Sequence, residues 1–214
     1  MPDPNMKIKK WQNEIEEISK DVEDLLYSKS QAEELEKIIK SNPFVQQNVG
    51  SFWEHYKLNL VYFLISKIWH QIDEDKKSLS LINLLKNLLN NHELITKNWW
   101  IGKSKWLSTE TFEEEFGKIS LDPVIVCEDI QILKTATLSI KQIRHKRIAH
   151  TDKDRKLASK INYAKITEAT NQIEKLVIKY LLLLTQSGRD RLTPSSDDWQ
   201  IAFTKEWIVK KEYY

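Results

Sequence analysis

Hydrophobic residues recur along the first third of the chain with the spacing of α-helices. From Met6 to about Ser28 they return at three- and four-residue steps, with acidic residues on the other face, which predicts an amphipathic helix. A second helix is predicted over about residues 31–40, before an Asn-Pro pair, and a long third one over residues 45–72. We therefore expect three consecutive helices before the first charged turn.

The same helical pattern continues after the charged turn at residues 73–77. Either Ser78 or Ser80 can cap a leucine-rich helix over residues 79–89. Residues 98–108 are interpreted as a loop, followed by a short helix near residues 109–117. Helices are then predicted from residue 123 to about residue 150, opened by an Asp-Pro start signal, and from residue 162 to residue 186.

The composition favours the same fold class. The chain has 214 residues but only four Gly and five Pro, which is too few turn residues for a sandwich or barrel. Hydrophobic residues make up 41% and charged residues 30%, which is typical of a packed globule. We predict an all-α, antiparallel helical bundle over residues 44–187, with an N-terminal helical extension (residues 1–43) and an irregular C-terminal arm (residues 188–214).

Charge and cysteine content restrict the partners and the compartment. The formal charge is +2, so no global field draws the chain onto nucleic acid, and any polyanion site must be local. The single Cys127 excludes an internal disulfide framework and favours a reducing compartment. The first residues are polar, and the apolar runs are short or interrupted by Lys. A cytoplasmic location without a membrane span is therefore expected.

The main candidate site lies at the end of the helix predicted over residues 123–150. Its apolar stripe follows positions 126, 130, 133, 137 and 140, and continues to positions 144 and 147. Both are arginines, so Arg144 and Arg147 are predicted to project toward the core or a subunit interface. His150 falls on the edge of the same face, while His145 and Lys146 point outward.

Two interpretations of this arginine pair remain open. Arg144 and Arg147 can be structural residues paired with carboxylates of other helices, or they can line a cleft that receives an anion. Arg suits phosphate because its planar fork donates two hydrogen bonds and keeps its charge, and His suits proton transfer. Together they can cleave RNA without a metal, although one His150 cannot easily serve both proton transfers. Two copies that meet across a dimer axis would supply both.

The stretch from Ile143 to Asp152, IRHKRIAHTD, resembles the HEPN superfamily of helical nucleotide-binding and ribonuclease domains. That family carries an Arg, usually a polar residue next, and a His after four to six residues, which Arg144, His145 and His150 match. The ending Ala-His-x-Asp resembles the abortive-infection branch. Residues 65–88, with Ile-Asp followed by Ser-Leu-Ser-Leu, are similar to an earlier helix pair of that branch. The resemblance covers roughly residues 45–185.

The resemblance implies a metal-independent endoribonuclease that acts in anti-phage defence or as a toxin, with a composite site at a homodimer interface. Arg144, His150 and His145 would be its catalytic residues, and Lys146, Arg147 and Asp152 would bind RNA. An antitoxin or another defence-system protein is a possible partner. Some members of the superfamily only bind, so a non-catalytic module for RNA, a nucleotide or a protein stays the alternative.

A tryptophan-rich segment gives a second candidate RNA contact. Trp99 and Trp100 interleave with Lys103 and Lys105, a composition suited to stacking bases beside a phosphate backbone. The alternative is that these tryptophans clamp the segment to the core or fill a dimer interface. The remaining histidines are scattered without metal-ligand spacing, so no metal and no cofactor are expected.

Overall fold

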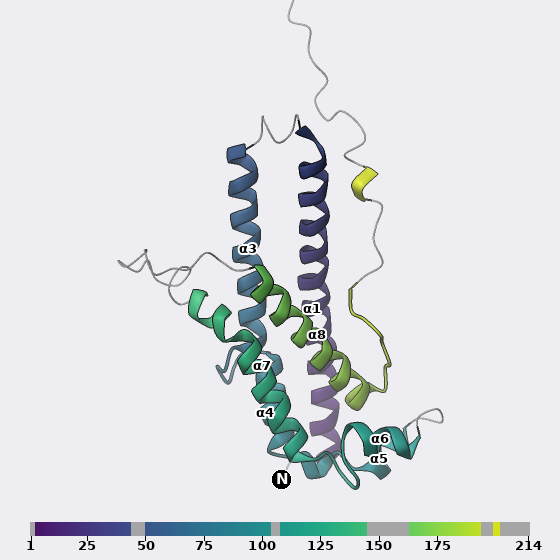
Figure 1. Ribbon diagram of the computed structural model, residues 1–214. Helices are drawn as coiled ribbons and strands as arrows, with labels where there is room; N and C mark the ends of the chain where they lie inside the picture. The colour runs from purple at the N-terminus through teal and green to yellow at the C-terminus, as the bar shows by residue number, and fades with distance from the viewer. Residues whose placement is uncertain (1–2, 44–49, 104–107, 145–162, 194–198, 202–214) are drawn as a thin grey trace, which may run out of the picture.

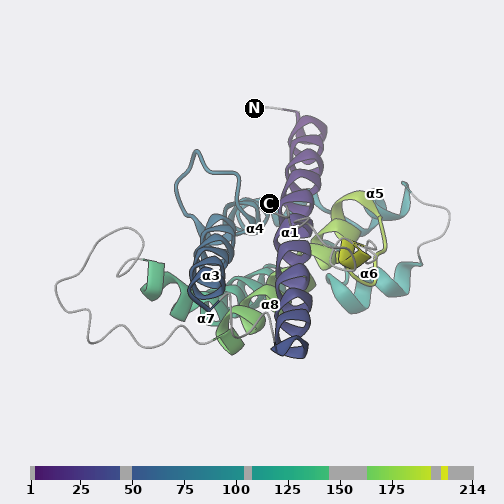
Figure 2. The same cartoon turned by 90° about the horizontal axis from the view of Figure 1, so that it is seen from above.

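The computed structural model describes residues 3–43, 50–103, 108–144, 163–193 and 199–201. Within these ranges every regular element is a helix, and the only β feature is an isolated bridge between Thr96 and Ser120. The predicted all-α class is therefore confirmed. Two long helices, α1 (Pro4–Ser41) and α3 (Gly50–Ile72), run antiparallel and side by side (Figures 1 and 2).

The first helix is longer than the sequence pattern predicted. The predicted break between residues 28 and 31 is wrong, because α1 runs without interruption to Ser41. Neither Gly nor Pro occurs there to interrupt the backbone ladder. Ala32 is buried in the continued helix, and Lys29 pairs with Glu33 one turn later at 2.7 Å. Two serines alone are thus insufficient to end a helix whose inner face stays in contact with its neighbours.

Three further helices complete the packed centre: α4 (Leu81–Leu89), α7 (Pro123–Ile143) and α8 (Tyr163–Thr185). α8 packs against α1 and α7, and α7 also contacts α3 and α4. The expected caps are present. Ser80 accepts from the backbone N–H of Asn83, and Asp122 accepts from that of Val124 at 2.8 Å, directly before Pro123. Figure 1 shows α7 and α8 crossing the α1–α3 pair near its lower half.

A smaller layer lies beside the first turns of α1 (Figure 1). It contains a 3₁₀ turn (His92–Leu94), α5 (Lys97–Ile101) and α6 (Thr109–Glu115). The loop predicted to begin at residue 98 is therefore partly wrong, since residues 97–101 are helical. The reason is a cap: the Thr96 side chain accepts from the backbone N–H of Trp99 at 3.1 Å.

Of the chain after α8, residues 186–193 are irregular, as expected, and residues 199–201 form a 3₁₀ turn beside the C-terminal half of α1 (Figure 1). Leu192 is buried, and the backbone N–H of Leu192 donates to Glu174 at 2.8 Å. Gln200 donates from its side chain to Glu34 of α1. The division of the chain at residues 43/44 and 187/188 stays a prediction. Trp11 and Ile15 of α1 belong to the same core cluster as the rest of the bundle.

Candidate functional site

Arg144 stands where the buried face of α7 ends. Val126, Leu133 and Ile140 of that face have no exposed area. Arg144 is the C-terminal cap of α7, and its backbone N–H donates to the carbonyls of Ile140 and Lys141. Its side chain is half-buried and reaches α3, where the guanidinium carbon lies 4.3 Å from the centroid of the Trp69 ring. This separation is within the range of a cation–π contact.

Asp73 is the described carboxylate on which the charge of Arg144 acts. No carboxylate within the described ranges forms an ion pair with this guanidinium. The pKa of Asp73 is lowered mainly because the Ser78 hydroxyl donates to its carboxylate at 2.8 Å. The positive charge of Arg144 lowers the pKa further, so the two groups interact through space. Arg144 and Asp73 are thus linked by charge, and no direct ion pair joins them.

The turn that carries Asp73 is fixed by hydrogen bonds to the start of α4. The Ser80 hydroxyl donates to the Asp73 carbonyl at 2.7 Å. The Asn83 amide donates to three carbonyls of the same turn, at 3.2 Å to Asp73, 2.7 Å to Asp75 and 3.1 Å to Ser78. Because buried or half-buried polar groups hold the turn this closely, the Asp73 carboxylate has a defined position beside the end of α7.

A second polar cluster lies one helical turn away on the α1–α3 contact. Asp21 of α1 accepts from Lys67 and Gln71 at 2.5 Å each and contacts His70 Nδ1 at 3.1 Å. The charge of His70 also lowers the pKa of Asp73, after the larger contributions already described. This cluster ties α3 to α1 at the helical segment that also carries Trp69.

The HEPN family model AbiU2 matches residues 8–205, which is almost the whole chain. The chain belongs to the AbiU2 family of HEPN proteins. The expected membership of the abortive-infection branch is thus confirmed, together with its all-α fold. No curated protein and no solved structure gives a significant match.

The candidate motif over residues 143–152 lies only partly within the described residues. Arg144 is placed, whereas the other candidates of the motif lie outside the described residues, and so does one candidate of the tryptophan segment: His145, Lys146, Arg147, His150 and Asp152, and Lys105. Sequence reasoning missed Trp69 and Asp73 as neighbours of Arg144. Asp73 lies within the stretch similar to the abortive-infection branch, so that resemblance was the available signal for it.

The two described tryptophans of the second candidate contact behave differently. Trp100 is fully buried, with ring centroids 5.4 Å from Phe112 and 6.1 Å from Phe116. The RNA-binding role expected for Trp100 is therefore wrong, because an enclosed indole has no face for a base; it clamps α5 to α6 instead. Trp99 is half-buried, and the Lys103 ammonium lies 4.5 Å from its ring centroid. An RNA contact at these two residues stays a prediction.

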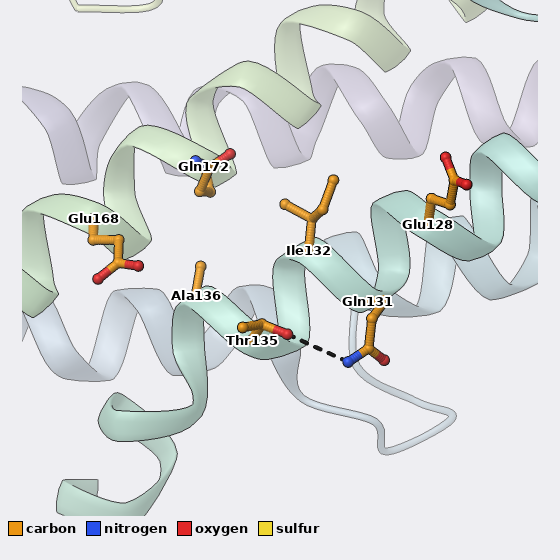
Figure 3. A pocket seen from close by; sticks show the side chains of 7 residues that line it. All are labelled: Glu128, Gln131, Ile132, Thr135, Ala136, Glu168 and Gln172. Atoms are coloured by element: carbon orange, nitrogen blue, oxygen red, sulfur yellow. Dashed lines mark hydrogen bonds between the residues drawn. The ribbon is translucent and has the colours of Figure 1, made fainter.

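A groove lies between α7 and α8, and Arg144 is not among its lining residues (Figure 3). Its seven lining residues are Glu128, Gln131, Ile132, Thr135, Ala136, Glu168 and Gln172. The charged members are both acidic, and Gln131 donates to Thr135 at 3.3 Å along α7. Because none of these side chains is cationic, the groove does not suit a phosphate backbone. We therefore assign no part of the candidate site to it.

Among the residues with a described placement, no group of three His, Cys, Asp or Glu side chains is arranged to hold a metal ion. None of the helices in the same ranges combines the length and the hydropathy needed to cross a bilayer.

Proposed function

We propose that this AbiU2-family protein is a metal-independent endoribonuclease of the HEPN type. The observation that carries the proposal is the setting of Arg144 at the end of α7. Its guanidinium rests on the Trp69 ring and forms no direct ion pair with a described carboxylate, in a chain whose family carries Arg and His at these spacings. Such a cation can still donate to an anion, which a guanidinium saturated by carboxylates cannot.

The proposed reaction needs only proton transfer and charge stabilisation. His150 takes the proton from a ribose 2′-hydroxyl, whose oxygen attacks the adjacent phosphorus. Arg144 stabilises the charge that builds on the non-bridging phosphoryl oxygens. The bond to the 5′-oxygen breaks, and that oxygen receives a proton from the His150 of a second copy. The products are a 2′,3′-cyclic phosphate and a 5′-hydroxyl, so no water and no oxidant is consumed.

The residues around this pair would hold the RNA. We propose that His145 assists catalysis and that Lys146, Arg147 and Asp152 contact the substrate. Lys103, Lys105 and Trp99 would extend the contact along the strand. Because cations displace counterions from phosphates, RNA binding should weaken steeply as salt concentration rises.

A homodimer follows from the proton count. One histidine cannot both remove a proton from the nucleophile and protonate the leaving group in a single step, whereas two symmetry-related copies can. We also propose that the protein acts in the cytoplasm, in anti-phage defence or as a toxin, and that an antitoxin or another defence protein restrains it.

The direct test is cleavage of RNA in excess EDTA by wild-type protein and by His150→Ala. His55→Ala is the matched control, because His55 is exposed on α3 and far in sequence from the motif. We expect the wild type and the control to cleave at equal rates, and His150→Ala to lose about 10²-fold or more of the rate.

Two results would decide against the nuclease. Cleavage by His150→Ala at the wild-type rate would remove the acid–base role of His150. Binding of RNA by the wild type without any new product would instead support a non-catalytic HEPN module. The product ends give a separate check, since hydrolysis through water would leave no cyclic phosphate.

A further inference from the structure

The position of the Arg144 side chain needs an explanation of its own. An arginine side chain has several rotatable bonds, and holding it in one orientation is opposed by its rotamer entropy. A guanidinium that stabilises a transition state is most effective when it is held in place before the reaction. Some part of the protein must therefore restrict Arg144 without occupying its N–H donors.

We infer that Trp69 and Asp73 are positioning residues that hold the Arg144 guanidinium ready for a substrate phosphate. This inference rests on the proposed function. The contact at 4.3 Å between the guanidinium and the Trp69 ring carries it, together with the fixed turn that presents Asp73.

Trp69 has the features of a fixed support. It packs against the hydrophobic core, next to Ile68 and Ile72, which are both buried. An indole ring attracts a cation more strongly than any other aromatic side chain. Attraction to the ring face does not consume the N–H donors as a carboxylate pair would. Arg144 can therefore be held over Trp69 and still donate to two phosphoryl oxygens.

Asp73 supplies a directing charge at a distance. Its carboxylate is occupied by the Ser78 hydroxyl at 2.8 Å and the backbone N–H of Asp75 at 3.2 Å. These bonds fix the orientation of the carboxylate within the turn. The same turn is linked to α7 through Glu74, which lies 2.6 Å from Lys86 and 3.7 Å from Lys134. Attraction toward Asp73 therefore restricts the guanidinium without neutralising it.

The test uses the Arg144 side chain itself as the reporter. The chain has five arginines, so the Nε–Hε region of a ¹H–¹⁵N spectrum is sparse, and Arg144→Lys assigns the Arg144 signal. An aromatic ring shifts protons above its face upfield. We expect Trp69→Leu to move the Arg144 signal downfield, and Trp69→Phe to leave part of the upfield shift.

Turnover is measured on the same proteins. We expect Trp69→Leu to lower kcat roughly 10-fold with little change in KM, and Trp69→Phe to recover most of the loss. Trp53→Leu is the matched control, because Trp53 lies on the same helix and stacks on Tyr56 at 5.6 Å. It should change neither the signal nor kcat. Should Trp69→Leu fail to fold, the smaller shifts of Trp69→Phe decide the question.

Asp73 is tested by a change that keeps its shape. We expect Asp73→Asn to lower kcat roughly 3-fold, because a directing charge at a partly exposed site has a modest effect. Asp75→Asn is the control: Asp75 is exposed in the same turn and accepts from the backbone N–H of Lys77 at 2.9 Å.

The outcomes separate this inference from the proposed function. An Arg144 signal that Trp69→Leu does not move overturns the inference, and so does a moved signal with unchanged kcat. In both cases an active wild type leaves the nuclease standing. A wild type that cleaves no RNA defeats the proposed function and the inference with it.

Discussion

Two charged residues on the inner side of α7, Asp129 and Arg144, have opposite surroundings. Asp129, near the start, is 6% exposed and accepts from Lys179 at 2.7 Å and from the Tyr180 hydroxyl at 2.8 Å. Arg144, at the end, is half-buried and contacts the Trp69 ring. Burial, and then the Asp129 carboxylate, raise the pKa of Tyr180, so its hydroxyl stays protonated and keeps donating.

The two residues differ in how many of their hydrogen-bonding groups stay available to a bound molecule. The cluster of Asp129, Lys179 and Tyr180 satisfies its charges within the α7–α8 contact, as a buried ionic group must. The guanidinium of Arg144 keeps its donors while an aromatic ring supports it. A charge on the inner face of a helix can therefore be structural or functional, and its partners distinguish the two cases.

The largest loss of stability is expected from a change at Asp129. Replacing Asp129 by Ala leaves Lys179 and the Tyr180 hydroxyl without their acceptor in the α7–α8 contact. We expect Asp129→Ala to lower the free energy of unfolding by about 3 kcal/mol, measured by urea denaturation.

The neighbouring Glu128 provides the control for that measurement. It is exposed on the same helix, so Glu128→Ala should change the free energy of unfolding by less than about 0.5 kcal/mol. If the two variants lose equal stability, the Asp129 cluster is not the structural centre described above.

A smaller effect is expected from Tyr180→Phe. This change removes one donor to Asp129 but keeps the ring and the Lys179 pair. We expect a loss of about 1 kcal/mol in the same urea experiment. A loss as large as that of Asp129→Ala would show that the hydroxyl, rather than the ion pair, dominates the cluster.

The smallest effect concerns Tyr163 at the start of α8, whose buried hydroxyl has no partner among the described residues. Burial, and then the charges of Glu33 and Glu36, raise the pKa of Tyr163 to about 12. An unfolded Tyr ionises near pH 10, so above about pH 10 the unfolded state loses a proton that the folded state keeps. Stability should therefore fall between about pH 10 and 12.

Tyr163→Phe removes this contribution and should show a shallower decline in urea midpoint over the same pH range. Identical declines for wild type and variant would mean that Tyr163 titrates as it does in the unfolded chain. Unlike Asp129 and Arg144, the Tyr163 hydroxyl has no partner among the described residues and no proposed role in binding a substrate.

The hydrophobic pattern predicted the helices well wherever one face meets the core. The stripe along α7, for example, led correctly to a side chain at position 144 on the inner side. The pattern failed where local chemistry decided: Thr96 caps a short helix at residue 97, and nothing stops α1 near residue 30. Trp69 could not be found from sequence, since it lies 75 positions before Arg144 and meets it only through the packing of α3 on α7.

The most direct test of the role proposed for Arg144 is the variant Arg144→Ala. Its RNA cleavage in EDTA and its thermal stability are both measured. Arg191→Ala, at an exposed arginine, is the control. We expect kcat of Arg144→Ala to fall by about 10²–10³-fold, while Tm changes by less than about 4 °C and Arg191→Ala matches wild type. Undiminished cleavage together with a clearly lower Tm would contradict the account, because Arg144 would then be as structural as Asp129.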